Sequence, residues 1–320
     1  MLDVVNLALP FFGLIFLGLA CGKFKAIPDS GLAWMDFFII YVALPALFYR
    51  IVAQTPLQQL ANPRFIVGTM LATFCAFMLS FVVGMLVRRG DLAGSTIAGL
   101  AGGYGNIGYM GPGLALATLG PDATAPVALI FCFDNILLFS LVPSLMALAG
   151  TDKKNLIQNV LDVIAKIALH PFIIATLLGV LSAATHFEPP TAVDRLMQFL
   201  QNAAAPTALF TLGVTVALRP LQAIPWEVPL AVVIKLVVHP VLVFVLLSLL
   251  GPFTEVWVYT AVLMAALPPA LNVFITARQY GVWVEQASSS VLLGTLVSVA
   301  TLTTAMWLVK THQLPAMIFR

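Results

Sequence analysis

The sequence carries little charge: only 9% of its 320 residues are Asp, Glu, Lys or Arg, whereas 61% are hydrophobic. A soluble globular domain has about 25% charged and about 45–50% apolar residues. So few charges cannot cover a water-soluble fold of this length, and so apolar a sequence excludes a disordered chain. The long apolar runs argue against an outer-membrane barrel, whose strands alternate apolar and polar over about 10 residues. The composition therefore predicts an all-α polytopic membrane protein.

Cysteine is scarce, and dense basic runs are absent. Cys21, Cys75 and Cys132 lie far apart in apolar segments, a spacing that fits neither a disulfide framework nor a zinc site. Without a basic run, the sequence has no signature of a nucleic-acid partner. No Lys or Arg precedes Lys23, so the first apolar run does not resemble a cleaved signal peptide. We expect no metal and no cofactor.

Ten apolar runs approach the length of about 20 residues that a transmembrane helix requires. The helices are expected near 4–22, 33–53, 65–87, 95–119, 125–149, 162–184, 192–218, 228–250, 256–280 and 286–309. The longest polar interval divides them into a first five-helix repeat (1–150), a short cytoplasmic linker (151–161) and a second five-helix repeat (162–320). With five helices in each half, the second half must enter the membrane in the opposite sense, which makes the repeat an inverted one.

Weak self-similarity at an offset of 161 residues supports this repeat. Pro10 pairs with Pro171, Pro45 with Pro206, and Gly120 with Gly281. One such match would mean little because proline is frequent in membrane helices. Three matches at one offset, each in the corresponding helix of its half, favour an internal duplication.

The orientation follows from the basic residues in the connections, because cytoplasmic loops are enriched in Lys and Arg. One side collects eight of them and the other four, while three fall within spans. The richer side holds Lys23, Lys25, Arg88, Arg89, Lys153, Lys154, Arg219 and Arg278, and the poorer side Arg64, Arg195, Lys310 and Arg320. We therefore expect a multi-pass protein of the cytoplasmic membrane with both termini outside the cytoplasm.

The fourth and ninth runs are poor continuous helices. Residues 101–120 contain six glycines before Leu114, together with Asn106 and Pro112, and residues 267–281 contain Pro268, Pro269 and Asn272. In a helix interior, Gly costs about 1 kcal/mol and Pro about 3 kcal/mol. Interrupted helices at matching positions of two halves indicate a transporter binding site. The alternative is that these residues only kink and pack the helices.

These segments resemble the auxin efflux carrier family, which includes bacterial carriers described as malonate transporters. The similarity rests on Ala43-Leu44-Pro45, on the stretch from Gly105 through Asn106, Ile107 and Gly108 to Pro112, on Phe133-Asp134-Asn135, on Lys235 to Pro240, and on LPPALNVFITARQYG at 267–281. The resemblance implies an inverted five-plus-five fold in which broken helices four and nine cross. It also implies a scaffold of helices 1, 2, 6 and 7, often dimeric, and a moving transport domain of helices 3–5 and 8–10.

On this resemblance, a small organic anion would bind at the crossing, with malonate, a similar carboxylate or an auxin-like acid as substrate. The expected substrate-binding residues are Gly105, Asn106, Ile107, Pro112, Pro268, Pro269 and Asn272. An elevator-type alternating access, secondary active or facilitative, would carry the substrate across the bilayer. The partners would be the anion, the lipid bilayer and a second copy of the chain.

Ionisable residues inside a membrane are candidates for function. The coupling or charge-pair candidates are Asp134, Asn135, Lys235 and His239. Asp134 could bind a coupling proton, with Na+ as the other coupling ion considered, or it could form a structural pair with Lys235. Arg50 is expected to extend its side chain to the membrane interface.

The sequence leaves two alternatives to a carrier. A polytopic membrane enzyme is disfavoured because HExxH and GxSxG motifs are absent. A channel is disfavoured because no filter repeat or ring of pore-lining charges is evident.

Overall fold

The computed structural model describes residues 2–25, 27–150, 168–218 and 225–315, together with positions 161 and 165. Within that part of the chain the structure is helical and contains no strand. Its one β-type pairing is an isolated antiparallel bridge between Gly105 and Pro269. The expected all-α class is therefore correct for the described residues.

In the described part of the chain, six helical stretches are long and apolar enough to cross a membrane: Asn6–Phe24, Ser30–Ala53, Pro63–Val87, Pro121–Leu148, Val228–Leu250 and Val284–Lys310. Three further apolar helices are shorter: Leu92–Gly103, Pro171–Thr185 and Glu255–Ala265. The expected span at 192–218 corresponds to α11, Thr191–Ala217, which is long but less apolar because it carries Asp194, Arg195 and several amides. The expected linker at 151–161 and the start of the sixth span lie almost entirely outside the described residues.

The chain divides into two compact units, and it passes between them several times. Unit 1 comprises residues 1–62, 108–132 and 168–220. Its helices are α1 (Leu2–Phe24), α2 (Asp29–Phe38), η1 (Ile39–Ala43), α3 (Leu44–Ala53), α4 (Leu57–Leu60), α7 (Gly111–Leu119), η2 (Pro121–Ala123), the first part of α8 (Thr124–Leu148), α10 (Pro171–Thr185) and α11. Residues 108–132, from expected spans four and five, thus group with spans one, two, six and seven.

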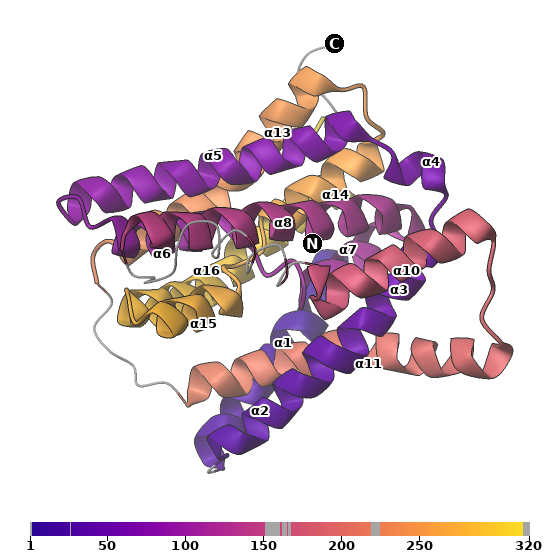
Figure 1. Cartoon of the computed structure of the whole chain (residues 1–320), viewed down its shortest axis with the longest axis horizontal. Coiled ribbons are helices and arrows are strands. Elements are labelled where there is room, and N and C mark those ends of the chain that lie inside the picture. The colour runs from indigo at the N-terminus through magenta and orange to yellow at the C-terminus, as the bar shows by residue number, and fades with distance from the viewer. Residues whose placement is uncertain are drawn as a thin grey trace. The chain divides into compact units, whose positions relative to one another are not determined.

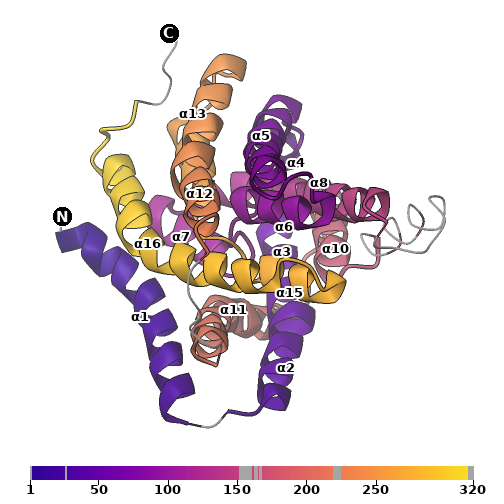
Figure 2. The same cartoon turned by 90° about the vertical axis from the view of Figure 1, so that its left-hand side faces the viewer.

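The core of unit 1 forms where α1 packs along α11 (Figure 2). Glycines permit this approach: a Cβ on Gly18 would lie 2.1 Å from the carbonyl oxygen of Phe210, and one on Gly213 would lie 2.0 Å from that of Ile15. Small residues at such crossings let backbones pack closely in apolar surroundings. Elsewhere in unit 1, the rings of Phe48 on α3 and Phe131 on α8 stack with their centroids 3.8 Å apart.

Unit 2 comprises residues 63–107, 133–167 and 221–320. Its helices are α5 (Pro63–Val87), α6 (Leu92–Gly103), the second part of α8, α12 (Val228–Val233), η3 (Ile234–Val238), α13 (His239–Leu250), α14 (Glu255–Ala265), α15 (Leu271–Tyr280) and α16 (Val284–Lys310). Helices α5 and α6 lie side by side (Figure 1). The Ser80 hydroxyl on α5 donates a hydrogen bond to the Ala98 carbonyl on α6, at 2.6 Å.

Two short π-helical turns interrupt long helices just before a proline. In η1 the amide of Leu44 donates to the Ile39 carbonyl, and in η3 the amide of His239 donates to the Ile234 carbonyl. Pro45 and Pro240 follow directly. Because proline lacks an N–H and its ring crowds the preceding turn, the hydrogen-bond ladder shifts by one residue here. Such π turns are frequent at functional sites, and η3 carries Lys235.

The three sequence matches at the offset of 161 have unequal structural counterparts. Gly120 and Gly281 each end a short helix with positive φ, +79° and +67°. Pro10, by contrast, lies inside α1, whereas Pro171 begins α10. The two glycines thus share a positive φ at a helix end but differ in ψ, −169° against +23°. The Pro10 and Pro171 positions differ, whereas Pro45 and Pro206 both lie within long continuous helical stretches.

Candidate functional site

Two of the expected spans are each split into two helices. The fourth is divided into α6 and α7 by residues 104–110, and the ninth into α14 and α15 by residues 266–270. The sequence accounts for both breaks, because glycine weakens the helix at 102–113 and Pro268-Pro269 removes two backbone donors. Both breaks are buried, apart from a partly accessible Gly108.

Within unit 2 the two breaks meet through their backbones. The amide of Asn106 donates to the Pro268 carbonyl at 2.8 Å, and the amide of Ala270 donates to the Tyr104 carbonyl at 3.0 Å. These bonds satisfy backbone N–H and C=O groups that have no partner within a helix. Buried backbone groups require such partners. Gly294 lets α16 pack closely against the crossing, because a Cβ at this position would lie 2.3 Å from Cδ of Pro269.

The crossing brings most of the expected substrate-binding residues together. Gly105, Asn106 and Ile107 are buried in one break, and Pro268 and Pro269 in the other. Asn272 is half-buried in the first turn of α15. Pro112 belongs to unit 1, so the structure does not group it with the others. No side chain caps α15, so its first amides retain the partial positive charge that favours an anion.

Tyr104 links the crossing to α8. Its hydroxyl donates to Oδ1 of Asn135 at 2.5 Å and accepts from Nδ2 of Asn272 at 3.2 Å. Asn135, a coupling candidate, thus forms one polar chain with the substrate candidate Asn272. The ring of Tyr104 also meets that of Phe139 edge-on, with centroids 6.2 Å apart. A buried tyrosine bonded at its hydroxyl holds both amide side chains in fixed orientations.

Lys235 lies against the same crossing and is fully buried. Its Nζ donates to the carbonyl of Ala265, the last residue of α14. A cation at a helix C-terminus is favoured by the helix dipole. Gly105 provides the space, because a Cβ there would lie 3.1 Å from both Cε and Nζ of Lys235. Lys235 and Asp134 form no direct salt bridge, although their charges interact.

A second polar group joins α5, α8 and α13 in unit 2. The Thr73 hydroxyl donates to Oδ2 of Asp134 at 3.0 Å and lies 3.2 Å from Nε2 of His239. All three side chains are at most 5% exposed. Among the described residues, Oδ1 of Asp134 and Nδ1 of His239 have no hydrogen-bond partner. We call Thr73, Asp134 and His239 the threonine cluster.

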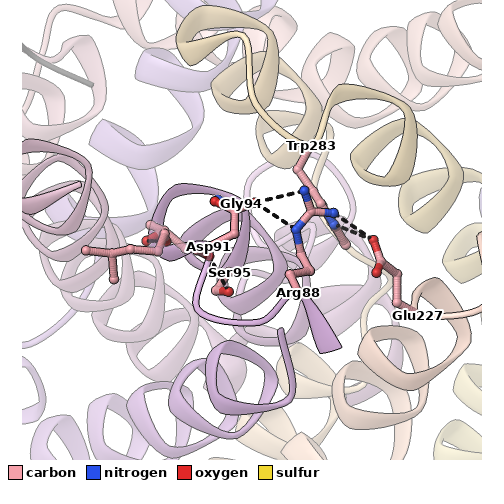
Figure 3. Close-up of polar contacts among 8 residues, drawn as sticks. Arg88, Asp91, Gly94, Ser95, Glu227 and Trp283 are labelled. Atoms are coloured by element: carbon pink, nitrogen blue, oxygen red, sulfur yellow. Dashed lines mark hydrogen bonds and ion pairs between the residues drawn. The ribbon is translucent and has the colours of Figure 1, made fainter. Parts of the chain in front are cut away.

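Arg88 organises a third polar group, at the ends of the unit 2 helices (Figure 3). Its guanidinium bonds Asp91 at 2.8 Å and Glu227 at 3.1 Å, and the Trp283 indole donates to Glu227 at 2.9 Å. Burial acts to raise the pKa of Asp91, but the Gly94 amide and the Arg88 guanidinium outweigh it and hold the pKa below its ordinary value of 3.8. Arg88 therefore ties α6 to the starts of α12 and α16.

The expectation for Arg50 is wrong. Instead of reaching the membrane interface, its side chain is buried in unit 1, where it forms an ion pair with Asp194 and donates to Gln201 at 2.8 Å. It also donates to the backbone carbonyl of Asp194 at 3.0 Å. The guanidinium fork satisfies three acceptors on one helix, which a snorkelling side chain would not do.

Sequence reasoning missed Thr73 and Tyr104. A lone threonine in an apolar span commonly bonds its own helix, as Thr69 does to the carbonyls of Phe65 and Ile66. Nothing in the local sequence separates Thr73 from Thr69. Tyr104 carried a weak signal, because a phenol inside a Gly-rich break must find a polar partner when buried.

Apolar spans, together with two broken helices that meet at a buried polar crossing, define a multi-pass membrane transporter. The chain belongs to the membrane transport protein family, whose sequence profile matches residues 3–308. The expected resemblance to auxin efflux carriers is confirmed by relatives of that name. The family and the relatives are described as transporters, so the chain is a transporter and not an enzyme.

Three relatives illustrate the range of proteins to which the chain is similar. The chain is 49% identical over 319 residues to a Rhizobium meliloti (strain 1021) protein named "Putative malonate transporter", with 100% of both chains covered. It is 29% identical over 144 residues to auxin efflux carrier component 5 of Arabidopsis thaliana, covering 43% of this chain and 40% of the other. It is 23% identical over 301 residues to the uncharacterized transporter YfdV of Escherichia coli (strain K12), covering 92% and 93%.

Proposed function

We propose that the chain is a secondary carrier of a small organic anion, malonate or a similar short carboxylate. The observation that carries the proposal is the backbone crossing of the two breaks, at 2.8 Å and 3.0 Å. Unwound backbone at membrane depth is tolerated where it is buried in protein or lines a cavity, and transporters bind substrates at such points. The name of the 49% identical relative supports malonate as the first substrate to test.

In this proposal the anion contacts the amide side chains of Asn106 and Asn272 and the uncapped amides of α15. Asn272 is oriented by Tyr104, whose hydroxyl accepts from its Nδ2. Lys235 contributes positive charge while its ammonium remains bonded to the Ala265 carbonyl. A short carboxylate would thereby meet N–H donors and a positive field, the pattern that recognises anions.

Alternating access would proceed by an elevator motion in the proposed inverted five-plus-five arrangement. Residues 104–107, residues 266–272 and the threonine cluster all belong to unit 2. A site built within one compact unit can be carried as a body. Unit 1, which holds residues 108–132 in addition to the expected scaffold helices 1, 2, 6 and 7, would then serve as the scaffold. The scaffold would also provide the proposed dimer contact.

Uptake of labelled malonate into liposomes that contain only the purified protein tests the function. Asn272→Ala and Asn106→Ala should each abolish or strongly weaken uptake while the protein remains folded. Asn202→Ala is the matched control, because Asn202 is exposed on α11. Wild-type rates in both site variants would place the site elsewhere. A shift in melting temperature by malonate, across a panel of organic anions, measures binding independently.

The proposed location is the cytoplasmic membrane, with both termini outside the cytoplasm. In a background in which Cys21, Cys75 and Cys132 are replaced, single cysteines at the two termini should react with an impermeant thiol reagent in intact cells. Reaction only after lysis would reverse the orientation. Reaction of one terminus alone would contradict an even number of spans.

A further inference from the structure

The Thr73 hydroxyl bridges two buried ionisable side chains. It lies 3.0 Å from Oδ2 of Asp134 and 3.2 Å from Nε2 of His239. Three different helices supply the cluster: Thr73 comes from α5, Asp134 from α8 and His239 from the start of α13. Two ionisable groups joined through one hydroxyl at these distances have the geometry of a proton relay.

The hydroxyl has one proton and can therefore bond the two groups in two ways. In the first, Thr73 donates to ionised Asp134, and His239 donates its Nε2 proton to Oγ1. In the second, protonated Asp134 donates to Oγ1, and Thr73 donates to a bare Nε2. The second arrangement leaves the histidine proton on Nδ1, an atom that has no partner among the described residues.

We propose that Thr73 relays a proton from His239 to Asp134 and that this relay loads the coupling proton of transport. A proton binds Nδ1 of His239 while the Nε2–H bond breaks and a new bond forms to Oγ1 of Thr73. The original hydroxyl proton passes to Oδ2 of Asp134. One proton has entered at the imidazole, the carboxylate is neutral, and His239 and Thr73 are again uncharged. The inference rests on the proposed carrier function.

Burial of the cluster favours a neutral Asp134, and the Lys235 ammonium disfavours a charged His239, although the same ammonium also stabilises an ionised Asp134. Lys235 interacts electrostatically with both Asp134 and His239, and Tyr104 interacts electrostatically with Asp134. A cation beside His239 disfavours an imidazolium, whereas a carboxylate in apolar surroundings is stabilised when it is neutralised. A proton that arrives at His239 is therefore driven on to Asp134. Lys235 acts from a fixed position, because its Nζ is bonded to the Ala265 carbonyl.

Thr73→Val tests the relay, because valine keeps the branched shape and removes the hydroxyl. Uptake driven by a pH gradient is compared with malonate–malonate exchange, in which the loaded carrier crosses in both directions and no proton must leave. The ratio of gradient-driven uptake to exchange should fall at least about tenfold. Thr73→Ser, which restores the hydroxyl, should recover that ratio.

Thr69→Val is the matched control. Thr69 lies one turn earlier on α5, is equally buried and bonds only carbonyls of its own helix. The Thr69→Val variant should show gradient-driven uptake and malonate exchange at wild-type rates. An unchanged ratio in Thr73→Val would overturn the relay. Absence of any malonate transport by the wild-type protein would instead overturn the proposed function, so the two failures are distinguishable.

If Thr73→Val does not fold, the His239→Gln variant provides a second test of the relay. His239→Gln retains hydrogen-bonding capacity but cannot accept and pass a proton at the ring. The same fall in the ratio is expected, with exchange as the internal reference. The relay would be contradicted if accumulation by the wild-type protein did not depend on an imposed pH gradient. An unchanged ratio in the His239→Gln variant would also contradict it.

Discussion

Two polar clusters, the group around Arg50 in unit 1 and the threonine cluster in unit 2, differ in how completely their polar atoms are hydrogen-bonded. In unit 1, the Arg50 guanidinium bonds a carboxylate, an amide and a backbone carbonyl. In unit 2, the threonine cluster leaves Oδ1 of Asp134 and Nδ1 of His239 without partners among the described residues. A saturated cluster holds one arrangement, whereas an unsaturated one has capacity left for a proton.

This difference separates a structural role from a transport role. Breaking a saturated buried ion pair strands a charge and lowers stability. Neutralising an unsaturated buried carboxylate removes a cost and need not lower stability. The same chemical change, removal of one carboxylate, should therefore have opposite consequences in the two units.

Asp134→Asn should produce the largest effect on transport. Because asparagine resembles a protonated carboxyl group, substrate binding and exchange should persist while gradient-driven accumulation falls by about a hundredfold. The melting temperature should stay equal or rise. Asp194→Asn, the unit 1 counterpart, should show the reverse pattern. If Asp134→Asn melts lower and Asp134→Asn with Lys235→Met recovers stability, the two residues form a structural pair instead.

Asp194→Ala should produce the largest loss of stability. It leaves the Arg50 guanidinium buried with only Gln201 and a backbone carbonyl as partners. We expect a loss of about 1–3 kcal/mol, below the cost for a fully buried pair because the Asp194 side chain is 41% exposed. Melting in detergent measures the loss, and Glu188→Ala, at an exposed position, is the control. Equal melting of both variants would show that the Arg50 cluster is not structural.

Tyr104→Phe and Tyr49→Phe give a smaller, paired comparison. The Tyr104 hydroxyl serves Asn135 and Asn272, whereas the Tyr49 hydroxyl in unit 1 donates to Ser182 at 3.1 Å. Each lost hydrogen bond is worth about 1 kcal/mol. Tyr104→Phe should raise the KM for malonate about tenfold, and Tyr49→Phe should lower stability slightly at unchanged KM. Similar KM values for both variants would remove Tyr104 from the site.

Asp91→Ala should produce the smallest effect, confined to stability. Asp91 caps α6 by accepting from the Gly94 amide at 2.9 Å, and loss of such a cap costs about 1 kcal/mol. Because its folded pKa lies below the ordinary value of 3.8, the contribution is present at neutral pH and disappears as the pH falls below about 4. The difference in melting temperature from the wild type should narrow as the pH falls from 7 to 3.5, and Asp122→Ala is the exposed control. A constant gap at all pH values would contradict the role of the charge.

Local chemistry made part of this architecture predictable. Helix breaks depend on Gly and Pro in the segment itself, so residues 104–110 and 266–270 could be placed from sequence. The class of protein followed from composition in the same way. The side-chain partners could not be placed, because they depend on packing between distant helices. Arg50 meets Asp194 across 144 residues, and Thr73 meets His239 across 166.

Residue type also misled where two identical residues have different partners. Thr69 and Thr73 occur one turn apart in the same apolar helix, yet only Thr73 faces α8 and α13. Pro112 belongs to the same Gly-rich stretch as Asn106, yet the two fall in different compact units. Sequence spacing thus located the breaks but could not assign residues to the units on either side of them.

Proton uptake on malonate binding tests most directly the claim that the unsaturated cluster carries the coupling proton. Calorimetric titration of the purified protein in buffers of different ionisation enthalpy reports the protons that are taken up. The account predicts uptake in the wild type and in Asp194→Asn, and loss of that uptake in Asp134→Asn with malonate still bound. Binding heats independent of the buffer in the wild type, or equal proton uptake in Asp134→Asn, would contradict it.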